Sequence, residues 1–250
     1  MGGRSVPWSM APGPRPSPLD RRQALALLGR AGALLVTGCG SVPAGPPCAP
    51  ATELTAGPYW RDAPLNRSDL RWDTRAPGSA PRPGVPLRLA IRVAAAIDDG
   101  CEPVHAARVD VWHCDAEGLY SDVPDRGTGG RDFLRGYQVT DLTGRVTFST
   151  IFPGWYAGRA VHVHTRVRLF DPFGETTTDV STQIFFDDAV TDAVLATAPY
   201  VERGARDTRN ATDPIYGGHA ELLVALEGQP DSGYGGEIAL GVRIGEVRSG

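Results

Sequence analysis

The sequence predicts an all-β protein, an antiparallel sandwich or barrel with long loops and one short helix. Three observations support this class. The chain holds 31 glycines and 22 prolines among its 250 residues, which suits short strands and turns better than a helical bundle. Short segments in which apolar and polar residues alternate recur along the chain. Only residues 188–198 have a helical pattern, with Asp187 as the candidate N-cap.

Each alternating segment fits a strand with one buried face, because successive side chains of a strand point to opposite sides. The expected strands cover residues 87–93, 107–112, 145–151, 161–170, 180–186, 221–226 and 237–244. Repeated short strands separated by turn residues are typical of antiparallel sandwiches. We therefore expect one antiparallel β domain, a sandwich or a barrel, over residues 53–248.

Composition limits the classes of function. The formal net charge is −4, and no basic stretch stands out. A protein that binds nucleic acid usually has a basic patch, so we expect no nucleic-acid partner. The hydrophobic fraction of 41% is enough for one sizeable core in a chain of this length.

Residues 1–39 resemble an export signal. The twin arginine Arg21-Arg22 precedes an apolar run over residues 24–36 and a short segment of small residues. This order is typical of a signal peptide, and the twin arginine indicates the Tat route. The end of the segment, VTGC, also resembles a bacterial lipobox, in which Cys39 would be lipidated. The alternative is an ordinary helix that holds two arginines.

This signal predicts where the mature protein would act. We expect export through Tat, followed either by secretion or by anchoring to the membrane through a lipid on Cys39. Residues 40–52 are rich in proline and small residues and have no core of their own. They are expected to form a flexible tether.

The cysteines allow one expected pairing. Cys101 and Cys114 flank a strand-like segment, which would hold them on the order of 30 Å apart if it is extended. A disulfide needs Cα atoms only about 4.4–6.8 Å apart. Export would place the domain where disulfides persist. We therefore expect a Cys48–Cys101 disulfide and a buried free thiol at Cys114.

The stretch PGWYAGRAVHVH places His162 and His164 two residues apart. On a strand both imidazoles would project from one face. Two ordinary histidines on a solvated face are the simpler explanation, and a metal site needs more ligands. No carboxylate lies within the stretch, but Tyr156 precedes it closely and Tyr120 lies upstream in VWHCDAEGLYSD. Phenolate is a hard anionic ligand that suits a ferric ion better than zinc or ferrous iron.

Longer stretches around these residues resemble the intradiol ring-cleavage dioxygenases, especially exported single-domain members. The stretches are DVWHCDAEGLYSD, FLRGYQVTD and TIFPGWYAGRAVHVH, with ELTAGPYW before them and STQIFFDD after them. The resemblance runs from about residue 48 to near the C-terminus, and it implies a β-sandwich of the intradiol dioxygenase type. The spacing between Tyr156 and His162 is shorter than in the intracellular members, which leaves the pocket shape and the substrate open.

The resemblance implies one Fe(III) per chain, bound by two tyrosinates and two imidazoles. Tyr120 and His162 correspond to the family's equatorial ligands. Tyr156 and His164 correspond to the axial ligands.

The resemblance also implies roles for neighbouring residues. Tyr156 would be catalytic as well as a ligand, because the incoming diol displaces the axial tyrosinate in this family. Arg159 matches the active-site arginine whose charge stabilises electron-rich substrate intermediates, and Gln183 matches a polar residue near the substrate. Tyr59 and Tyr137 are further candidates for the substrate pocket.

The activity that the resemblance implies is cleavage of a catechol-type ring between its two hydroxylated carbons with O2, giving a cis,cis-muconate type diacid. A small aromatic diol and O2 are the implied partners, and a homodimer is an implied assembly. Two alternatives remain. One is a zinc or Fe(II) enzyme that uses His162 and His164 with a distant carboxylate. The other is a non-catalytic β-sandwich that binds a sugar or a protein at the cell surface.

Overall fold

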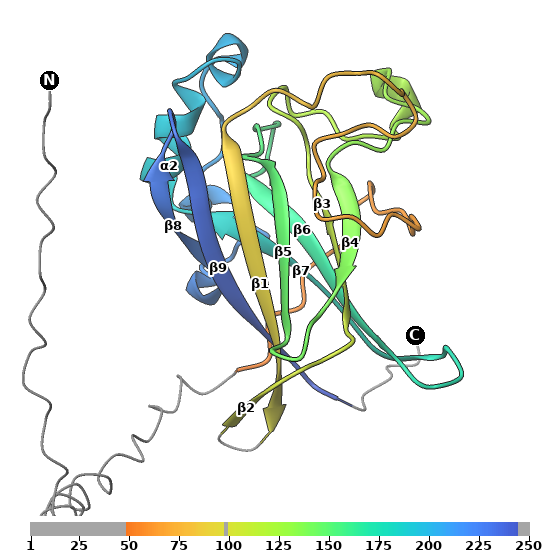
Figure 1. Cartoon of the computed structure of the whole chain (residues 1–250). Helices are drawn as coiled ribbons and strands as arrows, with labels where there is room; N and C mark the ends of the chain where they lie inside the picture. Colours follow the sequence, from red (N-terminus) through yellow and green to blue (C-terminus); the bar gives the residue numbers. More distant parts are fainter. Residues whose placement is uncertain (1–48, 98–99, 245–250) are drawn as a thin grey trace, which may run out of the picture. The chain divides into compact units, whose positions relative to one another are not determined.

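The computed structural model describes residues 49–97 and 100–244, which belong to one compact unit (Figure 1). The expected export signal, Cys39 and Cys48 lie outside the described residues. The strands are β1 Pro86–Ile97, β2 Gly100–Pro103, β3 Arg108–Trp112, β4 Arg135–Val139, β5 Arg145–Ile151, β6 His162–Phe170, β7 Thr176–Phe186, β8 Leu223–Gln229 and β9 Gly233–Val242. The helices are α2 Asp188–Leu195 and the 3-10 turns η1 Pro124–Arg126, η2 Tyr200–Arg203, η3 Asn210–Thr212 and η4 Ala220–Leu222.

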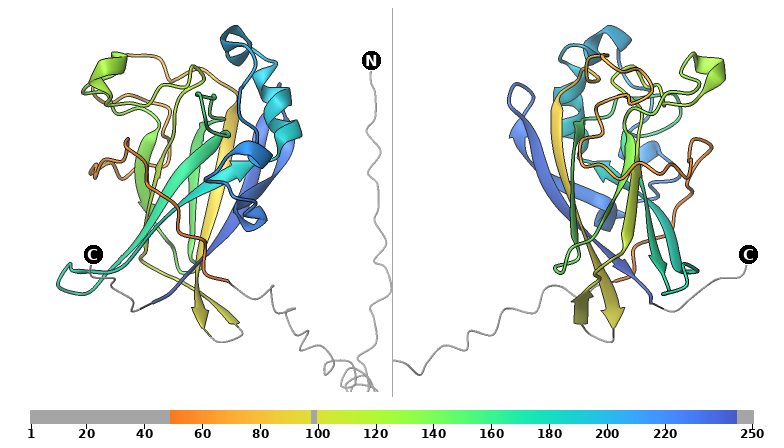
Figure 2. Two further views of the ribbon diagram at one scale, coloured as in Figure 1. Left: turned by 180° about the vertical axis from the view of Figure 1, so that it is seen from behind. Right: turned by 45° about the vertical axis from the view of Figure 1, so that its right-hand side comes forward.

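The described strands form one mixed sheet in the order β2-β1-β9-β8-β7-β6-β3-β4, with β5 paired to β1. The expected all-β class with one short helix is confirmed, but purely antiparallel pairing was wrong: β1 pairs with β9 in parallel, and so does β7 with β8. The sheet curls, so that β8, β9, β1 and β5 lie across from β7, β6, β3 and β4 (Figures 1 and 2). Alternation along a sequence marks the buried face of a strand, but it does not give the direction of the neighbouring strand.

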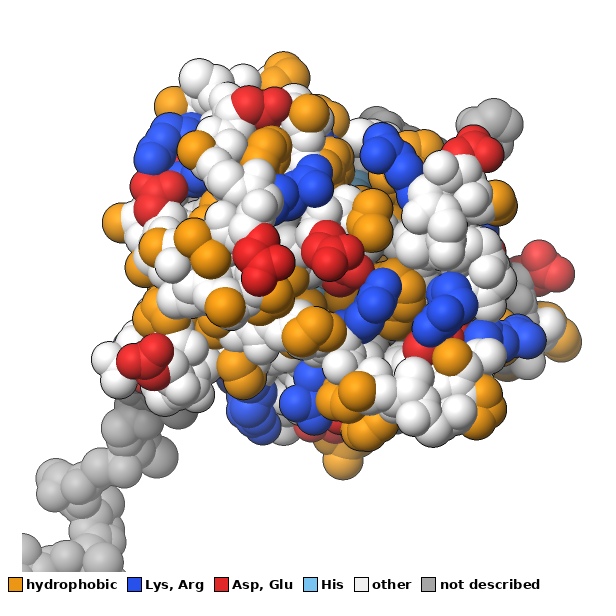
Figure 3. Space-filling model, turned by 90° about the horizontal axis from the view of Figure 1, so that it is seen from above, with side chains coloured by type: hydrophobic (Ala, Val, Ile, Leu, Met, Phe, Trp, Pro, Cys, Tyr) orange, Lys and Arg blue, Asp and Glu red, His pale blue; other side chains and the backbone are white. Residues whose placement is uncertain are grey.

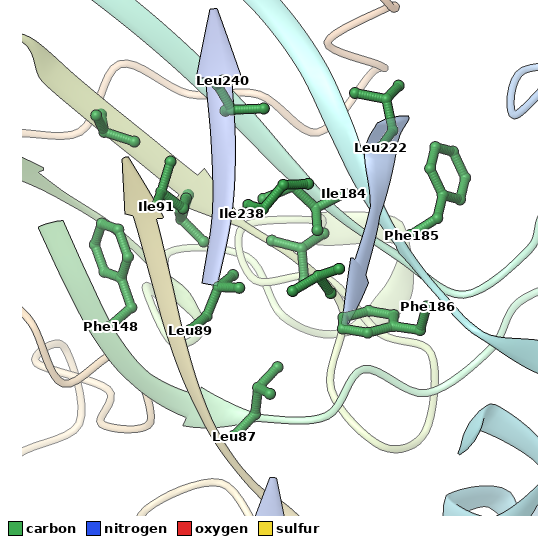
Figure 4. Close-up of a cluster of buried hydrophobic side chains, with 14 of the residues drawn as sticks. Leu87, Leu89, Ile91, Phe148, Ile184, Phe185, Phe186, Leu222, Ile238 and Leu240 are labelled. Carbon is green, nitrogen blue, oxygen red and sulfur yellow. The ribbon is translucent and has the colours of Figure 1, made fainter. Parts of the chain in front are cut away.

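The core lies between the two halves of the curled sheet. Leu87, Leu89 and Ile91 point inward from β1 and are almost fully buried (Figure 4). Phe148 of β5 and Ile184 of β7 pack in the same cluster. Because the two sheet halves supply the same cluster, hydrophobic burial stabilises the curled shape as well as the individual strands.

Strand β4 was missed because its sequence, RGYQV, does not alternate. Its position is set instead by its pairing with β3 and by the segment of residues 65–70, which passes over it. A Cβ on Gly136 would lie 2.8 Å from Leu70 Cδ2 and 3.1 Å from the Leu65 carbonyl oxygen. A glycine is therefore needed where this crossing segment passes.

Helix α2 begins as expected. The Asp187 carboxylate accepts hydrogen bonds from the backbone N–H groups of Ala189 and Val190, which satisfies donors that the first helical turn leaves free. Along residues 49–97 and 100–244, no helix is long and apolar enough to cross a membrane. On the face seen in Figure 3, arginine side chains are intermixed with acidic ones.

The segment just before the domain is also part of the β structure. Pro50 forms a bridge with Gly241, and the Ala51 N–H donates to the Gly241 carbonyl. Residues 50 and 51, which the sequence predicts as part of the tether, therefore contact β9. Cys114 is free and buried, as expected. Cys101 is disulfide-bonded, and its expected partner lies outside the described residues.

Candidate metal centre

Strand β6 places two imidazoles side by side in the interior. His162 and His164 are each 2% exposed, so the explanation as solvated histidines is wrong. The valines between and after them, Val163 and Val167, point to the core on the opposite face. Trp112 of β3 is the register partner of His164, and the two rings stack with centroids 5.0 Å apart. This aromatic contact limits the rotation of the imidazole.

The two tyrosines come from loops that are fastened to each other. The Gly154 N–H donates to the Asp115 carbonyl at 3.0 Å, and a Cβ on Gly154 would lie 2.4 Å from the Ala116 carbonyl oxygen. Glycine thus permits the close approach that brings the two loops together. Their phenol rings meet edge to face, with the centroids of Tyr120 and Tyr156 5.8 Å apart.

Three potential ligand atoms converge at this point. Tyr156 Oη lies 3.1 Å from His162 Nε2, which in turn lies 3.1 Å from His164 Nε2. His162 Nδ1 lies 2.7 Å from the Ala160 carbonyl oxygen, an acceptor only, so Nδ1 carries the proton and Nε2 presents a lone pair. Ligands about 2.1 Å from one metal ion and at right angles to each other are about 3 Å apart. The separations therefore fit a shared metal ion.

Tyr120, the fourth expected ligand, gives the clearest evidence for a cation site. The hydroxyl of Tyr120 is buried and has no hydrogen-bond partner among the described residues. A buried polar group without a partner costs about 1–3 kcal/mol. A cation bound between the phenols and the imidazoles would remove this cost. The four residues thus fit a Tyr2His2 metal site.

Burial controls the protonation of these groups. It raises the pKa of Tyr156 to about 12 and the pKa of Tyr120 well above its ordinary value. Burial also lowers the pKa of His162 to about 3 and that of His164 well below its usual value. The imidazoles are therefore neutral, which is the form that binds metals. Bound to a highly charged cation, the phenols would ionise, because a metal ion reverses the local preference for the neutral form.

Arg159 is held beside the imidazoles by two partners. Its Nε donates to Asp213 Oδ2 at 3.0 Å, and its Nη2 donates to Gln183 Oε1 at 2.5 Å. The Gln183 side chain is fixed in turn, because its Nε2 donates to the Thr55 carbonyl at 2.8 Å. The guanidinium is thus oriented before any substrate binds.

Asp213 was not found from the sequence. Its carboxylate is fully buried and also accepts hydrogen bonds from the backbone N–H groups of Ala160, Ile215 and Tyr216. Burial alone would raise its pKa, but these N–H groups and the Arg159 charge lower it below the usual value. Asp213 thus links Arg159 and the start of β6 to the segment after η3.

A cavity of about 440 Å³ opens against the tyrosines. Tyr59, Tyr120 and Tyr156 line it, and the rings of Tyr59 and Tyr120 stack with centroids 4.5 Å apart. Tyr137, the other candidate for the substrate pocket, lies elsewhere. Tyr137 belongs to β4, where its ring lies 3.8 Å from the Arg108 guanidinium carbon and does not line this cavity.

The available donor atoms also test the alternative of a zinc or Fe(II) site. Within residues 49–97 and 100–244, no cluster of three or more histidine, cysteine, aspartate or glutamate side chains could hold a metal ion. A zinc or Fe(II) site of the usual kind needs a third such ligand next to the histidine pair. Among the described residues, the phenols of Tyr120 and Tyr156 are the further donors next to the histidine pair, and such a donor set suits a ferric ion.

Comparisons with known proteins agree with this site. A family model described as "Dioxygenase" matches residues 55–211. The chain is 34% identical over 172 residues to a protocatechuate 3,4-dioxygenase beta chain from Burkholderia cepacia, covering 60% of this chain and 70% of that protein. It is 33% identical over 108 residues to a chlorocatechol 1,2-dioxygenase from Pseudomonas sp. (strain P51), covering 36% and 41%. An intradiol ring-cleavage dioxygenase from Tetranychus urticae has a similar structure, with a TM-score of 0.69 and 27% identity, covering 81% of this chain and 98% of that chain.

The fold and the site together define a dioxygenase. The chain belongs to the intradiol ring-cleavage dioxygenase family, whose members are oxidoreductase enzymes.

Proposed function

We propose that this protein cleaves a catechol-type ring between its two hydroxylated carbons with O2, giving a cis,cis-muconate type diacid. The observation that supports it best is the convergence of Tyr156 Oη, His162 Nε2 and His164 Nε2 next to the partnerless Tyr120 hydroxyl. The printed names of the relatives, a protocatechuate and a chlorocatechol dioxygenase, support the catechol class.

We propose that Tyr120, Tyr156, His162 and His164 hold one Fe(III) per chain. When bound, this ion would act as a Lewis acid that binds the diol and activates the ring toward O2. Two anionic phenolates offset much of its charge inside the protein, while neutral imidazoles complete the binding site without adding charge.

The chain's own residues would position the substrate and accept its protons. The cavity beside Tyr59, Tyr120 and Tyr156 has room for one substituted aromatic ring.

 

Tyr156 is half-buried, whereas Tyr120 is 3% exposed. Because Tyr156 is the more accessible phenol, we assign it as the acceptor of a diol proton.

Arg159 would stabilise negative charge as it develops on the substrate. Its guanidinium is oriented by Asp213 and Gln183 before substrate binds, and its side chain is only 14% exposed. A preorganised charge in a poorly hydrated site stabilises a transition state more than a mobile charge in water does.

The test is to load the purified protein with Fe(III), add a panel of catechols, and measure O2 consumption and product masses. We expect a red-brown protein whose visible absorption changes when catechol is added under nitrogen, and products that gain both atoms of O2. A colourless protein that binds zinc stoichiometrically and takes up no O2 would refute the proposal. Sugar or protein binding without turnover would support the alternative of a binding protein.

Export through Tat and lipidation of Cys39 stay predictions. They are tested by the mass of the N-terminal peptide of the mature protein and by replacement of Arg21-Arg22 with lysines.

A further inference from the structure

The loop that carries Tyr120 is organised around a buried carboxylate. Asp115 is 4% exposed, and its Oδ1 accepts hydrogen bonds from the backbone N–H groups of Glu117 at 3.0 Å and Leu119 at 2.9 Å. The Asp115 N–H donates in turn to the Leu119 carbonyl at 2.9 Å. These bonds close a tight turn over residues 115–119, of the kind that aspartate side chains stabilise. The Asp115 side chain therefore fixes the chain directly before the Tyr120 phenol.

The same turn is fastened to the loop that carries Tyr156. The Asp115 carbonyl accepts hydrogen bonds from the N–H groups of Gly118 and Gly154, each at 3.0 Å. A Cβ on Gly118 would lie 2.3 Å from the Trp155 carbonyl oxygen, so the backbones of the two loops are in contact there. Both contacts lie directly before Tyr156. A displacement of the turn at Asp115 would therefore move both phenols.

Arg82 neutralises this carboxylate from a third segment of the chain. Its Nη2 lies 2.9 Å from Asp115 Oδ2, while the two backbone N–H groups bind the other carboxylate oxygen. The guanidinium carbon of Arg82 lies 3.7 Å from the centre of the Phe133 ring, and the Arg82 N–H donates to the Arg71 carbonyl at 2.9 Å. A buried carboxylate is unfavourable without a paired charge, so Arg82 stabilises Asp115 in this position. Neither residue lines the cavity beside the tyrosines.

We infer that the Asp115–Arg82 ion pair positions both phenols of the metal site and thereby sets the affinity of the site for Fe(III). This inference rests on the proposed function. The phenol rings meet edge to face, and the Tyr120 hydroxyl has no hydrogen-bond partner among the described residues. The order of the phenols therefore depends on the loop backbones, which the ion pair joins. Residues that orient metal ligands typically change metal affinity about 10–100-fold when they are replaced.

The test replaces the members of the ion pair and measures iron binding. Asp115→Asn keeps an oxygen for the two backbone N–H donors but removes the charge that binds Arg82. Arg82→Gln removes the other charge, and Arg82→Lys keeps that charge without the planar guanidinium. We expect Asp115→Asn and Arg82→Gln to lower the affinity for Fe(III), measured by competition with a chelator, at least about tenfold. Arg82→Lys should lower it less.

The visible absorption of the iron-loaded proteins tests whether the phenols have moved. This absorption arises from charge transfer from phenolate to ferric iron, so it reports the tyrosine ligands directly. We expect its maximum to shift in Asp115→Asn and Arg82→Gln, whereas a loss of stability alone would leave the absorption of the folded protein unchanged. The double variant Asp115→Asn/Arg82→Met buries no unpaired charge, so the test remains valid if Arg82→Gln does not fold.

Arg71→Gln is the matched control. Arg71 is close to Arg82 in the chain, but it pairs with Asp69 at 2.8 Å and not with Asp115. This variant should bind iron with wild-type affinity and absorption.

Wild-type affinity and absorption in both Asp115→Asn and the double variant, with or without a loss of stability, would overturn the inference and leave ring cleavage intact. A wild type that binds iron but cleaves no catechol would refute the proposed function and leave the positioning role intact. A wild type that binds no iron would refute both.

Discussion

The two halves of the site are built differently. In the half around β6, His162 binds the Ala160 carbonyl and Arg159 binds Asp213 and Gln183, while the buried Nδ1 of His164 has no hydrogen-bond partner among the described residues. In the half that the loops supply, hydrogen bonds hold the loop backbones, but the phenol rings meet through aromatic contacts and the hydroxyl of Tyr120 has no hydrogen-bond partner among the described residues.

This difference indicates which part of the site metal binding would stabilise most. Hydrogen bonds hold His162 and Arg159 in position whether or not a cation is bound. The loop-borne half contains a polar group whose burial is unfavourable until it gains a partner. Metal binding should therefore stabilise the loops around Tyr120 and Tyr156 more than it stabilises β6.

The largest expected effect comes from Tyr120→Phe. Removing this ligand should abolish stable iron binding, since even residues that only support metal ligands change metal affinity about 10–100-fold. The metal-free variant should nevertheless be about 1 kcal/mol more stable than the metal-free wild type, because a buried hydroxyl without a partner has been removed. Iron content and urea unfolding of the iron-free proteins measure the two effects.

Tyr59→Phe is the control for this variant. The Tyr59 ring stacks on Tyr120, but we assign it no metal contact, so Tyr59→Phe should keep its iron. A Tyr120→Phe variant that retains full iron content would contradict the assignment of Tyr120 as a ligand.

Arg159→Gln should separate iron binding from turnover. Because the guanidinium is not a ligand, we expect normal iron content. We expect kcat to fall about 10²–10³-fold, the usual effect of removing a preorganised group that stabilises developing charge. Steady-state kinetics and metal analysis on one preparation check both. Unchanged kcat would remove Arg159 from the mechanism.

The strand-borne half was the part that could be predicted from the sequence. Spacing alone places His162 and His164 on one face of a strand, because the side-chain period of a strand is two. The N-cap at Asp187 could be predicted as well, because capping depends on residues two or three positions away. Such local features are visible in a sequence without knowledge of the fold.

Contacts between distant segments could not be predicted. Asp213 reaches Arg159 across 54 residues, and nothing in the spacing of DPIYGG indicates a carboxylate beside the active-site arginine. The stacking of Trp112 on His164 depends on the register of β3 against β6. The parallel pairing of β1 with β9 likewise depends on the path of the whole chain.

Asp213→Asn tests whether the order of the strand-borne half depends on this carboxylate. One side of the asparagine amide would face N–H donors with its own NH2 group, so Arg159 should lose its fixed orientation. We expect kcat to fall about tenfold, a loss worth about 1.4 kcal/mol, with KM little changed. Arg159→Gln should then lower kcat much less in the Asp213→Asn background, because the two residues act together. Additive effects would argue against a shared role.

The last prediction concerns protein stability and His113, which lies outside the proposed ligand set. Its ring nitrogens lie 2.8 Å from the Cys114 carbonyl oxygen and 2.7 Å from Thr150 Oγ1. Burial lowers the pKa of His113 to about 4 from its ordinary 6.5. Between these values the unfolded chain takes up a proton that the folded chain does not, so the folded state should lose up to about 1.4 kcal/mol per pH unit as the pH falls.

His113→Gln should reduce this acid sensitivity, because glutamine does not titrate and can still bond to Thr150. Urea unfolding of the iron-free proteins at pH 7 and pH 5 measures it: the wild type should lose more stability between the two than the variant does. His162 and His164 titrate in the same direction, so some acid sensitivity should remain in the variant. Equal losses in both proteins would show that His113 takes up its proton in the folded state as readily as in the unfolded chain.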